Sequence, residues 1–292
     1  MLLNRLSILL IGLIFISALS SCKKDELVVI NNNTAPPDQS IADITIETYI
    51  NRAYISLLGR KPLQAEYDTS FVKLRSSNLS ANSRSEFLDL IFSQQEYLDK
   101  LYENARIDML NNQDTNDYAF QMGVLISLLG NPAYQLLWDE ITIEINRLEV
   151  LRMIPSKMYS GNMNAADMYR TCADNFYYDQ INMGSLNFVV AVFQQFLDRY
   201  PTQSELQNGI DMVDGQNAIL FFQSGQSKTD FLNIFFTSID YHEGRVKHFY
   251  NKYVFRNPDS NEMYQLTQLY FNSKNIKDIQ KSILSSNEYI GI

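Results

Sequence analysis

An internal repeat restricts the fold of this chain more than any other feature of its sequence. Each of three copies has a head, in which an aromatic residue lies six residues before an arginine, a proline two after it and a glutamate six after it. The heads contain Tyr54, Arg60, Pro62 and Glu66; Phe193, Arg199, Pro201 and Glu205; and Tyr250, Arg256, Pro258 and Glu262. Each head has a tail with a Ser or Thr, then an acid three residues later and a tyrosine directly after the acid. The tails contain Ser93, Glu96 and Tyr97; Thr237, Asp240 and Tyr241; and Ser285, Glu288 and Tyr289.

The repeated positions predict where helices begin and end. Tyr54, Leu57 and Leu58 have the spacing of one buried helical stripe. The proline then stops that helix, because it lacks an N–H and disfavours helical backbone in the residue before it. Thr202 to Glu205 and Asp259 to Glu262 have capping-box spacing, so a second helix starts there. The first copy has Leu63 in this slot, and we expect Pro62 to open its helix instead.

The tails predict a further helix start in each copy. Capping boxes are expected from Ser93 to Glu96, Thr237 to Asp240 and Ser285 to Glu288. The unit is therefore helix, proline turn, helix, loop and helix. The arginine-to-Ser/Thr separation is 33, 38 and 29 residues, so the copies differ mainly in their connections.

Composition agrees with a helical fold. The 292 residues include only 7 Pro and 11 Gly, too few for the many tight turns of a sandwich or barrel. We predict an all-α fold: a helical repeat or bundle of three related units with a helical insertion, following a signal peptide and a flexible tether. The expected segments are 1–21 (signal peptide), 22–42 (lipidated cysteine and tether), 43–99 (repeat 1), 100–187 (insertion), 188–241 (repeat 2) and 242–292 (repeat 3).

The N-terminus has the features of an exported lipoprotein. Arg5 precedes an apolar run from Leu6 to Leu19, as in a signal peptide. Leu19-Ser20-Ser21-Cys22 resembles the lipobox of bacterial lipoproteins, which implies cleavage before Cys22 and lipid on its sulfur. The charged run after it, residues 23–26, resembles the surface-export signal of Bacteroidota lipoproteins. We expect a lipid anchor in the outer membrane with the protein at the cell surface, the periplasmic face being the alternative.

The repeat also resembles a known pattern. Its heads and tails are similar to the "YRxLLGRxPxxxE…SxEY" repeat of unknown function in bacterial surface-associated proteins and to the phycobilisome linker repeat. This resemblance implies an interaction or scaffolding module. Gly59 of the first copy is replaced by Asp198 and Phe255 in the others, so those copies are expected to turn differently. The repeated Arg and Glu are interpreted as structural, since one active site would not need three copies.

The insertion holds the residues we consider for binding. Helices are expected over 99–110, 118–129 and 132–153. Tyr177, Tyr178, Asn182 and Asn187 form a polar-aromatic stretch that could stack on and bond to a sugar or peptide, or simply lead into repeat 2.

Few features point to catalysis. The net charge of −9 disfavours nucleic acid as a partner. His242 and His248 lie six residues apart and face different directions on a helix, so no metal site or cofactor is expected. Glu140 and Glu144 share a helix face, but Arg147 follows them. Cys172 is expected to be a buried thiol.

Two functions follow from these features. The first is a non-catalytic binding or scaffold subunit of an envelope assembly, joined to the membrane through Cys22 and to a protein or a glycan through its folded part. The alternative is a hydrolase of polysaccharide, or a glycan-binding accessory of nutrient uptake. A pocket lined by paired carboxylates would favour the hydrolase.

Overall fold

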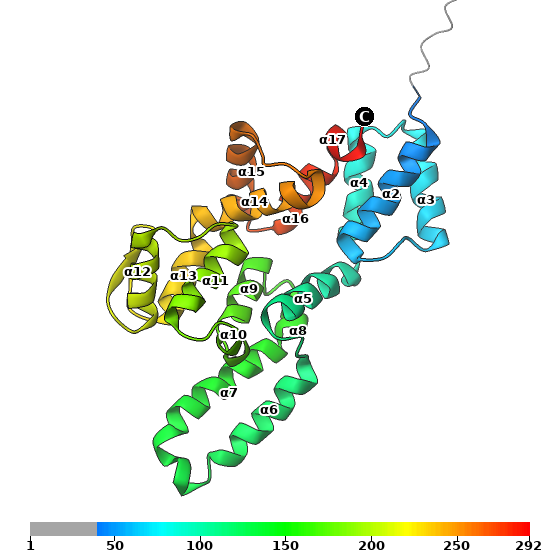
Figure 1. Ribbon diagram of the computed structural model, residues 1–292. Coiled ribbons are helices and arrows are strands. Elements are labelled where there is room, and N and C mark those ends of the chain that lie inside the picture. Colours follow the sequence, from blue (N-terminus) through cyan, green and yellow to red (C-terminus); the bar gives the residue numbers. More distant parts are fainter. Residues whose placement is uncertain (1–39) are drawn as a thin grey trace, which may run out of the picture. The chain divides into compact units, whose positions relative to one another are not determined.

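The computed structural model describes residues 40–292, and helices dominate this part of the chain (Figure 1). Residues 41–292 form one compact unit, in which the only strands are two short ones. The predicted all-α fold is confirmed. The predicted signal peptide, Cys22 and nearly all of the predicted tether (22–42) lie outside the described residues.

The first unit folds into three helices and leads into a fourth. They are α2 (Asp43–Leu58), α3 (Gln64–Ser76), α4 (Ala81–Phe92) and α5 (Gln95–Met109). Tyr54, Leu57 and Leu58 are buried on α2, because residues three and four apart share one face of a helix. The expected boundary between residues 99 and 100 falls inside α5, so the insertion begins within the last helix of the unit.

The second and third units share a helix. The second contains α11 (Ser185–Leu197), α12 (Gln203–Val213) and α13 (Lys228–Thr237); the third contains α14 (Ile239–Val254), α15 (Ser260–Ser273), α16 (Ile276–Leu284) and α17 (Asn287–Ile290). Helix α14 begins within the tail of the second unit, so that it contains Asp240 and Tyr241, and it also contains Tyr250, the first residue of the third head. The expected boundaries at 187/188 and 241/242 therefore also fall inside helices.

The long connection of the second unit forms a β-hairpin. Strands β1 (Ala218–Leu220) and β2 (Gln223–Gly225) pair antiparallel, with Leu220 opposite Gln223. The two turn residues, Phe221 and Phe222, have φ of 48° and 63°. Such turns favour Asn and Gly, and two phenylalanines gave no turn signal in the sequence.

The helix that precedes each repeated arginine ends in a left-handed residue, directly before the arginine. The φ angles are 74° at Gly59, 54° at Asp198 and 59° at Phe255. The expectation that the copies without glycine turn differently is wrong. A side chain in this conformation costs about 1–2 kcal/mol, and the contacts that follow the turn hold it in place.

The starts of the second helices confirm two predictions and correct one. Glu205 N–H donates to Thr202 Oγ1 at 3.3 Å, and the Glu205 carboxylate accepts the Thr202 N–H at 2.7 Å. Asp259 and Glu262 form the same box. In the first unit Leu63 holds the capping position, and Glu66 accepts its N–H at 2.7 Å. Pro62 precedes the cap, so the expectation that it opens the helix is wrong.

The capping boxes expected in the tails are displaced by one residue. The N-cap residues are Gln94, Ser238 and Ser286, not Ser93, Thr237 and Ser285. Ser238 and Ser286 accept the N–H groups of Tyr241 and Tyr289, both at 3.1 Å. The tail acids do not complete a box, because they stand at the second helical position and a tyrosine stands at the third.

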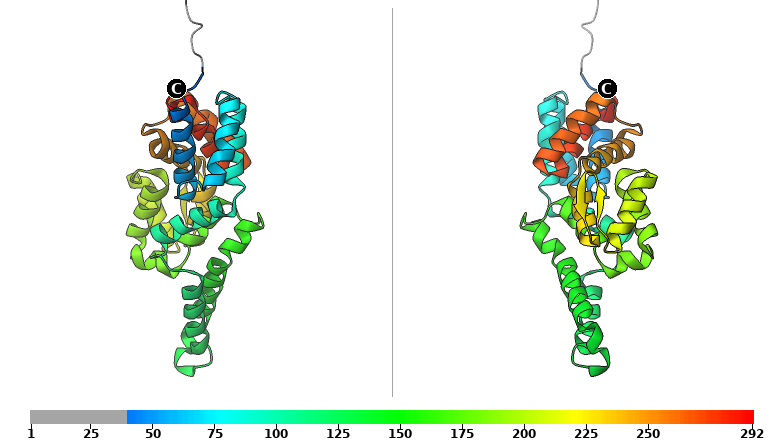
Figure 2. Two further views of the ribbon diagram at one scale, coloured as in Figure 1. Left: turned by 90° about the vertical axis from the view of Figure 1, so that its right-hand side faces the viewer. Right: turned by 90° about the vertical axis from the view of Figure 1, so that its left-hand side faces the viewer.

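The insertion continues through a helical hairpin and three short helices. Its elements are α6 (Thr115–Leu128), η1 (Pro132–Leu137), α7 (Trp138–Arg152), α8 (Ile154–Tyr159), α9 (Ala165–Ala173) and α10 (Phe176–Ile181). Helices α6 and α7 pack against each other and extend away from the other helices of the unit in every view (Figures 1 and 2). We call residues 115–152 the projecting hairpin.

Repeats 1 and 3 lie side by side although they are distant in sequence. The buried Tyr97 hydroxyl donates to Gln280 Oε1 at 2.6 Å, and the Tyr289 hydroxyl lies 3.1 Å from Ser56 Oγ. Arg84 donates to the Ser285 carbonyl at 2.8 Å. The tail tyrosines thus join units through a buried ring and a bonded hydroxyl.

Candidate functional site

Each repeated arginine is the centre of an ion cluster. In the first unit Arg60 donates to both carboxylate oxygens of Glu66, at 2.8 and 3.0 Å, and to both of Glu96, at 2.7 Å each. It also donates to the carbonyl of Lys61 and lies 5.6 Å from the ring centroid of Tyr54. Glu66 comes from the head and Glu96 from the tail, so one guanidinium joins both ends of the unit.

The other units repeat this geometry with one variation. Arg256 donates to Glu262 and Glu288 at 2.6–2.7 Å, whereas Arg199 bonds Glu205 and approaches Asp240 only to 3.7 Å. The shorter side chain of Asp240 explains the wider gap. Hydrogen bonds from Arg256 lower the pKa of Glu262 to about 2. Pro62, Pro201 and Pro258 lie in the turn that each cluster spans. These donors and acceptors bond one another, so the motif residues have a structural use.

The structure does not bring the four candidate binding residues into one site. Tyr178 is buried, and its hydroxyl donates to Gln195 Oε1 at 3.0 Å, so this ring packs in the core of the structure. Tyr177 is half-buried against Tyr118. The amides of Asn182 and Asn187 donate to main-chain carbonyls four residues earlier, at 3.0 and 2.8 Å. The lead-in interpretation therefore describes this stretch better.

The projecting hairpin, in the same insertion, exposes apolar side chains along its length. None of the residues from Ala119 to Glu140 is buried. Phe120 is 74% exposed and Leu136, at the tip, is 95% exposed. Other exposed members are Val124, Ile126, Tyr134, Leu137, Ile143 and Val150. A helix that is apolar on several faces is usually buried. Helix α6 has the composition of such a core helix, but several of its apolar side chains are not covered by other helices.

All charged side chains between Arg106 and Arg147, a stretch that includes most of the hairpin, are acidic. Between Arg106 and Arg147 the sequence contains no Lys, Arg or His. Its charged residues are Asp108, Asp114, Asp117, Asp139, Glu140 and Glu144. The stretch between Asp117 and Asp139 is uncharged, and it includes Trp138, whose indole N–H donates to the Leu128 carbonyl at 3.3 Å. The hairpin therefore exposes apolar side chains with acids near them: Asp117 at the start of α6, and Asp139 and Glu140 in the first turn of α7, beside the tip.

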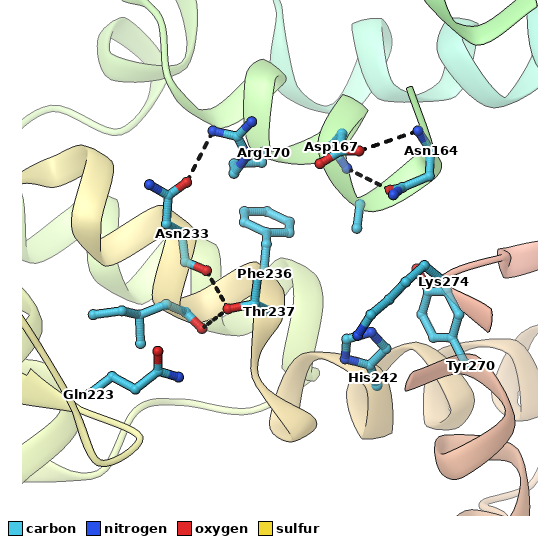
Figure 3. Close-up of a pocket in the computed structure, with 12 residues that line it drawn as sticks. Asn164, Asp167, Arg170, Gln223, Asn233, Phe236, Thr237, His242, Tyr270 and Lys274 are labelled. Atoms are coloured by element: carbon cyan, nitrogen blue, oxygen red, sulfur yellow. Dashed lines mark hydrogen bonds between the residues drawn. The ribbon is translucent and has the colours of Figure 1, made fainter. Parts of the chain in front are cut away.

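A cavity of about 400 Å³ lies between α9, α13, α14 and α15 (Figure 3). Its polar groups mostly bond one another. Arg170 donates to Asn233 Oδ1 at 3.1 Å, and Asp167 is held by the N-cap of α9. His242 is buried with Nδ1 2.6 Å from the Ser238 carbonyl, and burial lowers its pKa to about 4. A neutral ring packed on Tyr270 is a core group here.

A shallow depression beside α5 contains several acids, each with a partner. Glu96 bonds Arg60, Glu103 bonds Lys100 at 2.7 Å, Asp114 caps α6, and Asp99 accepts the Tyr159 hydroxyl. Elsewhere, Glu144 accepts the Phe176 N–H at 3.2 Å and lies 3.7 Å from Arg147. Burial raises the pKa of Glu144. Each of these acids therefore has a hydrogen-bond or ion-pair partner in the structure.

The remaining groups that could react or bind a metal have no arrangement that suggests such a use in the described residues. Cys172 is buried in the core, which raises the pKa of its thiol and disfavours nucleophilic chemistry. Within residues 40–292 we find no cluster of three or more His, Cys, Asp or Glu able to hold a metal ion. None of the helices in this range is long and apolar enough to cross a membrane.

Comparisons with known proteins leave the family open. The chain matches no protein-family model, no curated protein and no solved structure. The likeness of its repeats to surface-associated and linker repeats therefore stays a prediction from the residues alone.

Proposed function

We propose that this chain is a lipoprotein, anchored in the outer membrane by lipid on Cys22 with its folded part at the cell surface, and that it is a non-catalytic binding subunit of an envelope assembly. In this proposal the three repeats are a rigid frame, and the projecting hairpin docks into a protein partner. The observation that carries the proposal is the unburied apolar surface from Ala119 to Glu140.

The exposure of this surface needs an explanation. Phe120 and Val124 lie one turn apart on α6, so both face outward from the same side of the helix. Monomeric proteins rarely leave contiguous apolar surface in water, since covering it gains about 25 cal/mol per Å². Helices that dock into grooves use apolar anchors at this spacing.

The charge of the hairpin favours a protein over a lipid surface. Asp117, Asp139, Glu140 and Glu144 flank the apolar residues, and no cation lies among them. Anionic lipid headgroups would repel the acids beside the tip. A protein partner with an apolar groove and a basic rim would complement both the apolar side chains and these acids.

Site-specific photo-cross-linking in intact cells tests the docking. A photoreactive residue replacing Phe120 or Leu136 should capture a partner protein, whereas one replacing Val72 should not. Val72 is the matched control, because it is also apolar and 67% exposed but lies on α3 of the repeat frame. The double variant Phe120→Ser/Leu136→Ser should lose the cross-linked partner without a change in unfolding. Equal capture from Val72, or a partner that survives the double variant, would contradict the proposal.

The anchor is tested separately. Cys22→Ala should block processing and release the protein from the membrane fraction, and it should abolish labelling by a palmitate analogue. A Cys22→Ala protein that still labels and stays in the membrane would rule out this anchor.

A further inference from the structure

A second cavity, of about 330 Å³, lies where the three units and the insertion meet. Its walls come from α2, α5, α9, α11, α14 and α16, and we call it the central cavity. It is distinct from the projecting hairpin and from the cavity of Figure 3. Its volume is at the small end of the range for ligand pockets.

Arg245 is the buried charge of this cavity. The side chain is 4% exposed, and its Nη2 donates to the carbonyls of Gln195 and Phe196, both at 2.9 Å. These bonds hold the C-terminal end of α11 against α14, where the helices meet so closely that a Cβ on Gly244 would lie 2.3 Å from the Phe196 oxygen. Nε has no hydrogen-bond partner. Within the described residues no carboxylate lies within 4.0 Å of the guanidinium.

A buried guanidinium without a counter-charge is costly. Main-chain carbonyls satisfy part of its hydrogen-bonding capacity but carry no net negative charge. Structural arginines in proteins usually have a carboxylate partner, as the repeated arginines of this chain do. Arg245 is therefore a different kind of arginine from Arg60, Arg199 and Arg256, and an anion at its free edge would supply the missing charge.

Further basic side chains line the same cavity. His248 and Lys252 follow Arg245 by three and seven residues, so the three share one face of α14. Lys252 makes a ring contact with Tyr253 but no ion pair within the described chain. Lys100 reaches in from α5, although its ammonium bonds Glu103. Asp108 is the one acid among the lining residues, in a chain whose net charge is −9.

The remaining walls are aromatic, aliphatic and amide side chains. Tyr169, Phe196 and Phe249 offer ring surface, and Asn104 and Gln280 offer neutral donors and acceptors. Arginine and lysine together recognise carboxylate and phosphate oxygens. We propose that the central cavity binds a small organic oxyanion, with its carboxylate or phosphate group between Arg245 and Lys252 and its apolar body against Phe249.

The state of His248 gives the proposal a spectroscopic consequence. Burial and the cations of Arg245 and Lys252 lower the pKa of this imidazole. Lys100 and Asp108 face it from α5, and Tyr169 is the titratable group contributed by α9. An added anion would offset the cations and raise the His248 pKa.

The test uses the full-length chain in detergent with labelled histidine. The sequence contains two histidines, and His242 lies in the other cavity, so it is an internal reference for His248 in an NMR titration. Benzoate and phenyl phosphate should shift the His248 ring signals, leave those of His242 in place and raise the His248 pKa. Benzamide, the neutral analogue of benzoate, should do neither.

Variants separate the site from general charge effects. Lys252→Gln should weaken binding of benzoate and phenyl phosphate about tenfold. Lys247→Gln is the matched control, because it removes the same charge from α14 where Lys247 faces Asp198 at 3.6 Å, and it should leave binding unchanged. Arg245→Gln also loosens the end of α11, so the decision rests on Lys252. Equal affinity for benzoate and benzamide, no effect of Lys252→Gln, or inorganic phosphate binding as tightly as phenyl phosphate would overturn the proposal.

Discussion

The repeat frame and the projecting hairpin use similar apolar residues in opposite ways. In the frame, Phe196 is buried among Phe236, Tyr169 and Tyr241, with ring centroids 4.8–6.1 Å apart. In the hairpin, Phe120 is three-quarters exposed. The difference lies in neighbours rather than in residue type: the frame's helices are covered on several sides, whereas α6 packs mainly on α7. Apolar content alone does not locate a core, because burial requires a second surface.

The largest difference should appear when one phenylalanine is removed from each region. Phe196→Ala should lower the free energy of unfolding by about 3–5 kcal/mol through a core cavity. Phe120→Ala should change it by less than about 0.5 kcal/mol. Urea unfolding of the full-length variants measures both. A large loss for Phe120→Ala would mean that the hairpin is already covered in the isolated protein, for example by another copy.

A smaller effect is expected in the ion clusters. Arg256→Gln should cost about 1–2 kcal/mol near neutral pH, because Glu262 and Glu288 then face each other in a half-exposed site. Arg75→Gln is the control, since its ion pair with Asp43, at 3.1 Å, is on the surface and should contribute little.

The same cluster gives the frame a pH dependence. The folded pKa of Glu262 is about 2, against 4.5 for the unperturbed group. The stability from this depressed pKa is present above the unfolded value and is lost as the pH falls through the folded one. Between about pH 5 and pH 2.5 the free energy of unfolding should therefore fall less for Arg256→Gln than for the parent protein. If the free energy of unfolding falls equally with pH in both proteins, the cluster is not the source of the pH dependence.

The smallest effect concerns the left-handed turns of the frame. Phe255→Gly should raise the free energy of unfolding by about 0.5–1 kcal/mol, because glycine adopts φ of 59° without strain and the ring is exposed. Gly59→Ala should lower it by about 1 kcal/mol, since a Cβ there would also lie 2.8 Å from Lys100 Cε. Thermal unfolding tests the pair, and opposite signs are expected. Equal signs would mean that the three turns are not equivalent.

Prediction from sequence succeeded best where an interaction is local. The Thr202 and Asp259 capping boxes and the arginine-to-glutamate pairs span three and six residues, and the structure contains them as expected. The binding residues were chosen by type, and Tyr178 is buried, because a ring followed by amides has the same composition in a core as in a pocket. The sequence did contain a feature that marks the hairpin, namely the absence of charged residues between Asp117 and Asp139. Selecting residues by type alone overlooked it.

The sequence by itself determined that this protein is helical and built from three related units, because periodicity, proline positions and capping residues act within a few residues of one another. Tertiary structure decided which distant groups meet. Arg60 reaches Glu96 across 36 residues, and Arg256 reaches Glu288 across 32. Arg245 acquires neighbours from several helices but no carboxylate, and α6 acquires only one main partner. Such contacts form only when helices pack against one another. Burial and ion pairing then depend on residues that are far apart in the chain, so no short stretch of sequence predicts them.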